Sequence, residues 1–192
     1  MKIIRTSQLP IAILFSVFMV PAEVLAGADS GVYLGIGAGE AALTVKGSDP
    51  TDGDYNLDDS DVGYKLFGGY NFGYVPVIDL AVEISYVDFG TANSAFVNGN
   101  PISYEITGLN AFGLVGINLG PLGLFAKAGV ISWQLDSTIG TTNNSDSGTD
   151  TAYGLGAKLQ LSSYALRAEY EVYDVNSVND LDMFSVSIVF TF

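Results

Sequence analysis

Seven charged residues could act together, because all of them fall on the polar side of segments in which polar and apolar residues alternate. They are Lys65, Glu83, Lys127, Lys158, Arg167, Glu169 and Glu171. Counted from the strand ends, five fall at similar depths: Glu83, Lys127, Lys158, Arg167 and Glu169. A buried charge must find a partner because its desolvation is expensive. We therefore predict one layer of ion pairs across an interior, in which the cations of this group pair with Glu83 and Glu169.

Such a layer has two interpretations. If the alternating segments close into a small barrel, side chains just fill its interior, and the ion pairs would act as a structural plug. The alternative is a gate or an ion path between the same charges. The narrowness of a small barrel favours the plug.

The composition gives little support to catalysis. The chain contains no histidine and no cysteine. These absences remove the most frequent general base, the most frequent metal ligand and all thiolate chemistry. We therefore expect no enzymatic activity and no cofactor.

A second group of acidic residues occupies the polar stretch 40–61. They are Asp49, Asp52, Asp54, Asp58, Asp59 and Asp61. Their spacing resembles part of a calcium-binding loop, but Leu57 and Gly63 occupy the positions that require glycine and glutamate. The stretch is therefore either a solvated acidic loop or a weak site for a divalent cation.

Length and charge limit the possible partners. The chain has 192 residues, which suits one domain, and 48% of them are hydrophobic, with a mean hydropathy of +0.35. It carries 21 acidic and 7 basic residues, a net charge of −14 at pH 7. Because nucleic-acid binding requires clustered basic residues, we expect no nucleic-acid partner.

Residues 1–26 are predicted to be a secretory signal peptide. Two basic residues precede a charge-free apolar stretch, Leu9–Ala22, and small residues then suit cleavage after Ala26 or Ala28. An uncleaved anchor helix is the alternative, although the apolar run is shorter than the roughly 20 residues of a membrane span. Residues 27–192 would then form the exported domain.

The elements that position the charged residues are predicted to be eight β-strands. Apolar and polar residues alternate in each of them with a period of two, which is typical of a strand whose two faces have different surroundings. The segments are 32–39, 64–72, 79–87, 109–119, 124–131, 153–161, 166–173 and 184–192. Long polar connections (40–61, 90–102, 137–149 and 174–181) alternate with short ones (73–77, 120–123 and 162–164). This pattern indicates an up-and-down barrel with long loops at one end and tight turns at the other.

Two other folds compete with this prediction. The uncharged run from Ile106 to Ala126 is long enough for a transmembrane helix, but it contains five glycines and Pro121, which are poor helix formers. A soluble barrel with its apolar face inward is the stronger alternative. Against it, the polar face is rich in small residues, aromatic residues lie near the ends of the apolar face, and no position of the apolar face is charged. We therefore predict an all-β fold, an eight-stranded antiparallel up-and-down transmembrane β-barrel.

The chain resembles the small eight-stranded outer-membrane β-barrel proteins of the OmpA-like type, porin-family barrels of Gram-negative bacteria. The segments that carry the resemblance are GVYLGIGAG (31–39), GYKLFGGYNFG (63–73), LAVEISYVDFG (80–90), YGLGAKLQL (153–161), LRAEYEVYDV (166–175) and FSVSIVFTF (184–192). The resemblance implies a location in the outer membrane, and for Phe192 it implies recognition of the terminal strand by the barrel-assembly machinery. It also implies contact with membrane lipid and with lipopolysaccharide, whose phosphates a divalent cation at the acidic stretch would bridge.

Two functions are compatible with such a barrel. The first is a structural or surface-interaction protein, expected to be a monomer, that contacts a surface ligand through its extracellular loops while an ionic network plugs the lumen. The alternative is a narrow porin-like channel for small solutes or ions. Single-channel conductance separates them.

Overall fold

The structure is a computed structural model that describes residues 30–49, 53–73, 77–97, 100–139, 142–176 and 178–192. Within these ranges the side chains of 45–58, 93–102, 139 and 142 are not described. The predicted signal peptide lies outside the described residues, so its cleavage stays a prediction.

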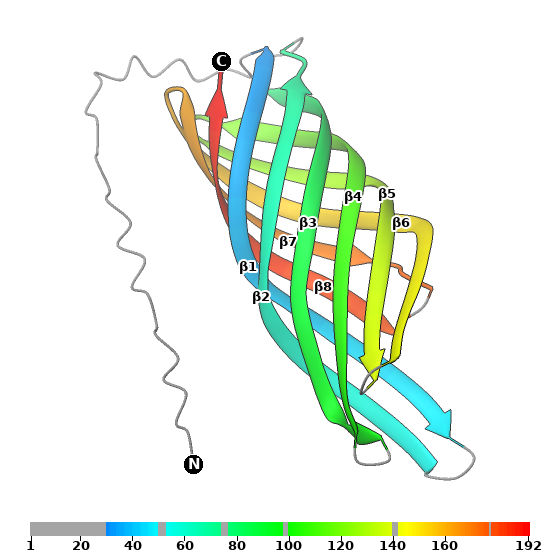
Figure 1. Ribbon diagram of the computed structural model, residues 1–192. Coiled ribbons are helices and arrows are strands. Elements are labelled where there is room, and N and C mark those ends of the chain that lie inside the picture. Colours follow the sequence, from blue (N-terminus) through cyan, green and yellow to red (C-terminus); the bar gives the residue numbers. More distant parts are fainter. Residues whose placement is uncertain (1–29, 50–52, 74–76, 98–99, 140–141, 177) are drawn as a thin grey trace, which may run out of the picture.

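Eight strands form one closed barrel in which each strand pairs with its neighbours in the sequence, always antiparallel (Figure 1). They are β1 (Gly31–Asp49), β2 (Gly53–Asn71), β3 (Ile78–Val97), β4 (Asn100–Leu119), β5 (Leu122–Ile139), β6 (Thr142–Leu161), β7 (Tyr164–Tyr173) and β8 (Asp180–Thr191). The barrel closes where β8 pairs with β1, from Tyr33 opposite Thr191 to Thr44 opposite Asp180. The predicted number, order and direction of the strands are confirmed. In the part of the chain that the structure describes, no helix is long and apolar enough to cross a membrane.

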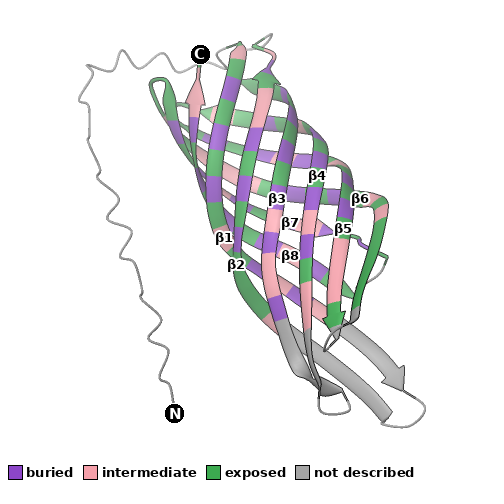
Figure 2. Cartoon of the chain, viewed as in Figure 1, coloured by how far each residue is buried: buried purple, intermediate pink, exposed green. Residues whose placement is uncertain are grey.

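The outward face of the barrel carries a broad apolar band. Ile36, Leu155 and Ile188 are 66%, 67% and 49% exposed, whereas Ser187, of opposite parity, is buried. Exposed and buried residues alternate in this way along the strands (Figure 2). So much exposed aliphatic and aromatic surface suits contact with hydrocarbon and not with water. The predicted orientation, with the apolar set outward, is confirmed.

The strands β1 to β6 run well past their predicted lengths. β1 and β2 stay paired up to Asp49 opposite Gly53, so the predicted loop 40–61 is largely a β-hairpin. The predicted loops 90–102 and 137–149 are likewise mostly paired ends of β3–β4 and β5–β6. These loop predictions were wrong because the extensions are rich in polar residues, and a polar stretch looks like a loop in the sequence. The irregular connection between β7 and β8 is confirmed between Tyr173 and Asp180.

The two ends of the barrel are therefore different. The end with the short connections, here called the turn end, has tight turns after β4 and β6, and the C-terminus lies there (Figure 1). Gly120, in the first of these turns, has a φ of 67°, which glycine adopts without strain. The opposite end, here called the hairpin end, carries the long paired extensions.

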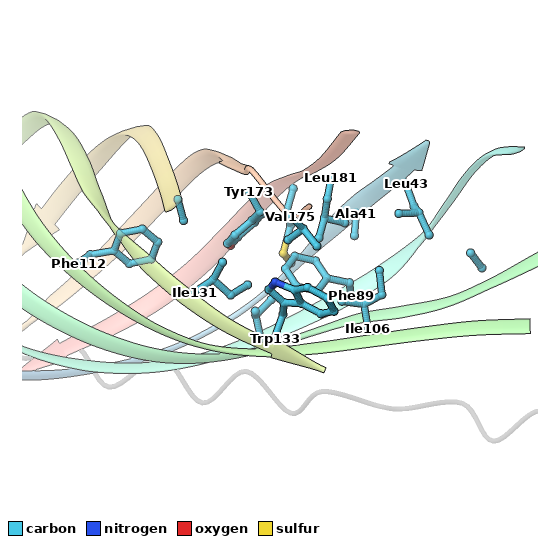
Figure 3. Packing of buried hydrophobic residues seen from close by; sticks show 14 residues of the cluster. Ala41, Leu43, Phe89, Ile106, Phe112, Ile131, Trp133, Tyr173, Val175 and Leu181 are labelled. Atoms are coloured by element: carbon cyan, nitrogen blue, oxygen red, sulfur yellow. The ribbon is translucent and has the colours of Figure 1, made fainter. Parts of the chain in front are cut away.

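Apolar side chains fill the interior of the barrel near both ends. The turn-end layer consists of Tyr33, Phe67, Ala81, Ala165 and Val189. The larger hairpin-end core includes Leu43, Val87, Phe89, Ile106, Ile131, Trp133, Tyr173, Val175, Leu181 and Met183 (Figure 3). Glycines make room for the large rings: a Cβ at Gly35 would lie 2.2 Å from the ring of Phe67, and one at Gly156 would lie 2.2 Å from the ring of Phe125. Between the two apolar regions lies a charged layer.

Candidate functional site

Six buried charged residues meet between the two apolar regions of the interior, and we call them the ionic cluster. They are Lys65 of β2, Glu83 of β3, Lys127 of β5, and Arg167, Glu169 and Glu171 of β7. The three residues from β7 alternate along the strand, so all three face inward. The cluster holds three cations and three carboxylates and is neutral when all six are ionised.

Each member of the ionic cluster contacts at least two opposite charges. The Lys65 ammonium lies 2.6 Å from both Glu169 and Glu171. The Lys127 ammonium lies 2.7 Å from Glu169, 2.6 Å from Glu171 and 3.6 Å from Glu83. The Arg167 guanidinium donates to Glu83 at 2.7 Å and to Glu169 at 2.6 Å. Glu169 therefore touches all three cations, and its removal would leave the largest imbalance.

The register brings these long side chains together. Gly154 lies between Lys127 on β5 and Glu171 on β7, so no side chain of β6 separates the two charges. A Cβ at Gly154 would lie 3.1 Å from the Glu171 side chain and 2.7 Å from the carbonyl oxygen of Tyr170. The glycine thus permits the ion pair.

Aromatic side chains surround the ionic cluster and were not identified as part of it from the sequence. The Tyr33 hydroxyl donates to Glu83 at 3.0 Å. The Lys127 ammonium lies 4.5 Å from the centre of the Phe112 ring, and the Arg167 guanidinium lies 4.6 Å from that of Phe67. Cations over ring faces are favourable where water is absent. In the sequence, the only sign of these aromatic residues was their place on the inward side of the alternating segments.

Lys158 does not belong to the ionic cluster, and this part of the prediction was wrong. Its ammonium pairs with Asp79 on β3, in a partly exposed position towards the turn end. Counting residues from strand ends ignored the stagger between strands. In the actual register Lys158 stands opposite Arg167, where a second cation is unfavourable. Asp79 was on the polar side of its segment but was not included among the candidates.

A comparison with known protein families identifies the family of this barrel. The sequence model of the outer membrane protein beta-barrel domain matches residues 11–192. The chain belongs to this outer-membrane β-barrel family. It is therefore located in the bacterial outer membrane, and the family orientation places the turn end at the periplasm and the hairpin end outside the cell.

Solved structures of other outer-membrane barrels have the same fold. Ail, the attachment invasion locus protein of Yersinia pestis, solved in complex with the heparin analogue sucrose octasulfate, matches with a TM-score of 0.56 and 18% identity over 84% of this chain and 99% of that one. Neisserial surface protein A matches with a TM-score of 0.59 and 14% identity over 85% of this chain and 98% of that one. A search of the curated proteins finds no match. At these identities the likeness establishes the fold alone.

Five of the six aspartates of the acidic stretch lie on the hairpin strands β1 and β2 of this outer-membrane barrel. Asp52 and the side chains of Asp49, Asp54 and Asp58 fall outside what the structure describes. The Asp61 carboxylate accepts the backbone N–H groups of Val62 and Thr91, both at 2.8 Å. These hydrogen bonds hold the pKa of Asp61 below its ordinary value. No group of three or more acidic side chains among those described is arranged to hold a metal ion, and the divalent-cation site stays a prediction.

Phe192 lies at the turn end beside the first strand. Its backbone N–H donates to the carbonyl of Val32 at 2.9 Å, and its side chain is 70% exposed. Its ring packs edge-on against Phe190, with 4.9 Å between the ring centres. The assembly role of Phe192 stays a prediction.

Proposed function

We propose that this protein is a surface-displayed outer-membrane barrel that conducts no ions and interacts with cationic partners through its hairpin end. The observation that carries the proposal is the separation of charge along the barrel. Within the described side chains, the basic residues all point into the lumen, whereas the hairpin end carries only acidic ones. These are Glu40, Asp59, Asp61, Asp88, Glu105, Asp136, Asp146, Asp150, Asp174, Asp180 and Asp182.

The charge of the hairpin end acts outward. The lumen charges largely neutralise one another, so the net charge of −14 resides mainly at the end that faces the cell's surroundings. A single-sign field of this kind attracts cationic molecules over about one Debye length, roughly 8 Å at physiological ionic strength.

Around Asp150 the hairpin end also has a defined shape. Its apolar core packs beneath the acidic surface, and Asp150 binds the connection between β7 and β8 to the barrel. The carboxylate of Asp150 accepts the indole N–H of Trp133 at 2.7 Å and the backbone N–H of Asn176 at 3.2 Å. An ordered surface loses less conformational entropy when a partner binds.

Three layers along the lumen support the closed state. An ion would have to pass the turn-end layer, the ionic cluster and the hairpin-end core in turn. Both apolar regions would strip its water without offering ligands, and eight strands enclose little space beyond the side chains. Because the cluster charges are occupied by one another, we also propose that the protein is not an enzyme.

The ligand of Ail does not carry over to this chain. Sucrose octasulfate is a polyanion, and its sulfates require basic side chains at the surface. The described side chains of the hairpin end include none, and its carboxylates would repel sulfates. The fold is shared, whereas the surface chemistry favours the opposite charge.

Two measurements test the proposal on the protein in lipid nanodiscs and planar bilayers. We expect a fluorescent nonalysine peptide to bind, a nonaglutamate peptide not to bind, and the nonalysine affinity to fall as salt is added. In planar bilayers we expect no steady conductance. Equal binding of both peptides would overturn the surface role. Large stable openings would overturn the closed lumen and favour the narrow channel.

A further inference from the structure

A small pocket lies at the hairpin end, beside the seam where the ladder between β2 and β3 ends. That ladder stops at Tyr64 opposite Asp88, whereas the β1–β2 and β3–β4 ladders on either side of it continue further out. The lining of the pocket comes from β1, β2, β3, β4 and β8. Its volume is about 10 Å³, which is close to the room that one water molecule needs. We call it the seam pocket.

The walls of the seam pocket are mostly apolar, and many of them belong to the hairpin-end core. The core residues among them include Leu43, Phe89, Ile106 and Leu181 (Figure 3). Two carboxylates, those of Asp59 and Asp61 on β2, complete the lining. In the β1–β2 ladder Asp59 stands opposite Leu43, which is buried in the core. Because paired residues point to the same face of a sheet, these aspartates occupy inward positions.

The negative charge of Asp61 is held in a fixed position. Its two carboxylate oxygens accept the backbone N–H groups of Val62 and Thr91, both at 2.8 Å. These donors are neutral, and they hold the pKa of Asp61 below its ordinary value, so the carboxylate is ionised at neutral pH. Gly90 leaves room for it, since a Cβ at this position would lie 2.7 Å from an Asp61 oxygen. The seam pocket therefore combines apolar walls with a preorganised anion.

The size and the charge of the seam pocket favour a lysine side chain over an arginine. A lysine ammonium is a compact group, close in size to a water molecule, with three donors. A guanidinium is a broader planar fork that pairs best with both oxygens of one carboxylate, and both oxygens of Asp61 already accept a backbone N–H. Asp59 and Asp61 are two residues apart on one strand, a rise of about 7 Å, so an ammonium between them can reach both.

We propose that the seam pocket binds the side chain of a lysine from a partner protein, with the ammonium between Asp59 and Asp61 and the methylene stem against the apolar walls. Lysine side chains commonly cover apolar surface with their stem while the charged end pairs elsewhere. This inference rests on the proposed function, because it gives the cationic partner a binding position. The acidic surface of the hairpin end attracts the partner, and the pocket distinguishes lysine from other cations of the same charge.

The first experiment compares two peptides on the full-length barrel in nanodiscs. One is the fluorescent nonalysine peptide, and the other is the same peptide with every lysine trimethylated at Nζ. Trimethylation retains the charge, removes the three donors and enlarges the head group. We expect the trimethylated peptide to bind roughly tenfold more weakly, because hydrogen bonds to ionised carboxylates are lost.

The outcomes separate the seam pocket from the proposed function. Equal binding of the two peptides would mean that charge alone recruits them, which would overturn the pocket and leave the proposed function intact. Failure of both peptides to bind would overturn both. This comparison uses the wild-type protein and therefore does not depend on the folding of any variant.

Three variants locate the binding position. Ala92→Leu fills the seam pocket without a change of charge, and Asp59→Asn with Asp61→Asn removes two charges from it. The matched control, Asp146→Asn with Asp174→Asn, removes two exposed charges elsewhere at the hairpin end. We expect the first two variants to abolish the advantage of nonalysine over its trimethylated form, and the control to retain it. An unchanged advantage in Ala92→Leu, or equal losses in the two double variants, would overturn the pocket.

Discussion

The membrane-facing part of the barrel and its hairpin end are built from the same strands with opposite chemistry. On β8, Ile188 points outward into the apolar band and Ser187 points inward. A few residues earlier on the same strand, Leu181 and Met183 are buried inside, and Asp182 faces out. Side chains alternate between outward and inward along the whole strand. In the membrane-facing part the outward residues are apolar, whereas at the hairpin end the inward residues are apolar.

The change of face shows where the solvent changes. Hydrocarbon around the barrel requires an apolar exterior, so polar side chains can be accommodated only inside, where they must pair. Water around the hairpin end permits an acidic exterior and requires the interior to be an ordinary apolar core. One closed sheet therefore meets two solvents, and its interior holds the ionic cluster and the turn-end layer in one region and the hairpin-end core in the other.

The largest expected effect comes from unbalancing the ionic cluster. Glu169→Ala removes the carboxylate that contacts Lys65, Lys127 and Arg167 and leaves an excess buried cation. We expect a loss of about 3–5 kcal/mol in the free energy of unfolding, because breaking one partner leaves an uncompensated buried charge. Urea unfolding followed by heat-modifiable gel mobility measures it.

Asp146→Ala is the control from the other region. This exposed carboxylate at the hairpin end should be removable with little change in stability. A barrel that tolerates Glu169→Ala as well as it tolerates Asp146→Ala would show that the cluster is hydrated, which would contradict the contrast between the regions. The same Glu169→Ala protein in planar bilayers should conduct more than the wild type.

The second effect compares two outward positions on β8. Ile188→Arg places a charge in the apolar band, at a cost of roughly 2–4 kcal/mol near the bilayer midplane. Asp182→Arg places the same side chain beyond the band, near Glu40 and Asp180, where we expect a smaller loss, limited to the hydrogen bond between Tyr170 and Asp182. The folded fraction on heat-modifiable gels distinguishes them. Similar losses at both positions would mean that the membrane boundary does not lie between Asp182 and Ile188 on β8.

The sequence predicted the barrel well and its hairpin end poorly. Strand number, order and outward parity followed from alternation near Ile36, Ile84 and Ile188, where every outward position is apolar or small. At the hairpin end the alternation persists, but the apolar residues take the opposite parity. Leu43 therefore fell within the predicted loop 40–61, and Trp133 fell beyond the end of the predicted segment 124–131. The apolar residues therefore do not keep one parity through both the membrane-facing part and the hairpin end.

The ionic cluster was predictable in its members and not in its geometry. Inward parity identified all six residues, because a charge cannot face hydrocarbon. It could not separate Lys158 from them, since the depth of a residue depends on the stagger of the strands and not on its distance from a strand end. The rings of Phe67 and Phe112 were likewise on the inward parity, but only the closed barrel brings them against the cations.

A smaller effect tests whether the hairpin-end core behaves as an ordinary core. Trp133→Phe keeps an aromatic ring and removes the N–H that donates to Asp150. We expect a loss of about 1 kcal/mol, confined to the hairpin end, because Asp150 retains the Asn176 donors. Hydrogen exchange should show faster opening of residues 174–176 and unchanged protection around the ionic cluster. Faster exchange around the cluster as well would mean that the two regions open as one unit.

The smallest effect is a pH dependence at the seam between β2 and β3. Hydrogen bonds from the N–H groups of Thr91 and Val62 lower the pKa of Asp61 relative to the unfolded chain. Their contribution is therefore fully present above the ordinary aspartate pKa of about 3.9 and is lost as the pH falls through the lower folded-state pKa. At neutral pH the seam should be intact, and acid should release it.

The amide proton of Thr91 reports this titration directly. Its NMR chemical shift should change with an inflection below the ordinary aspartate range, and Asp61→Asn should abolish the inflection while the barrel stays folded. An inflection at or above that range would mean that the Asp61 carboxylate does not hold the N–H of Thr91 on β3.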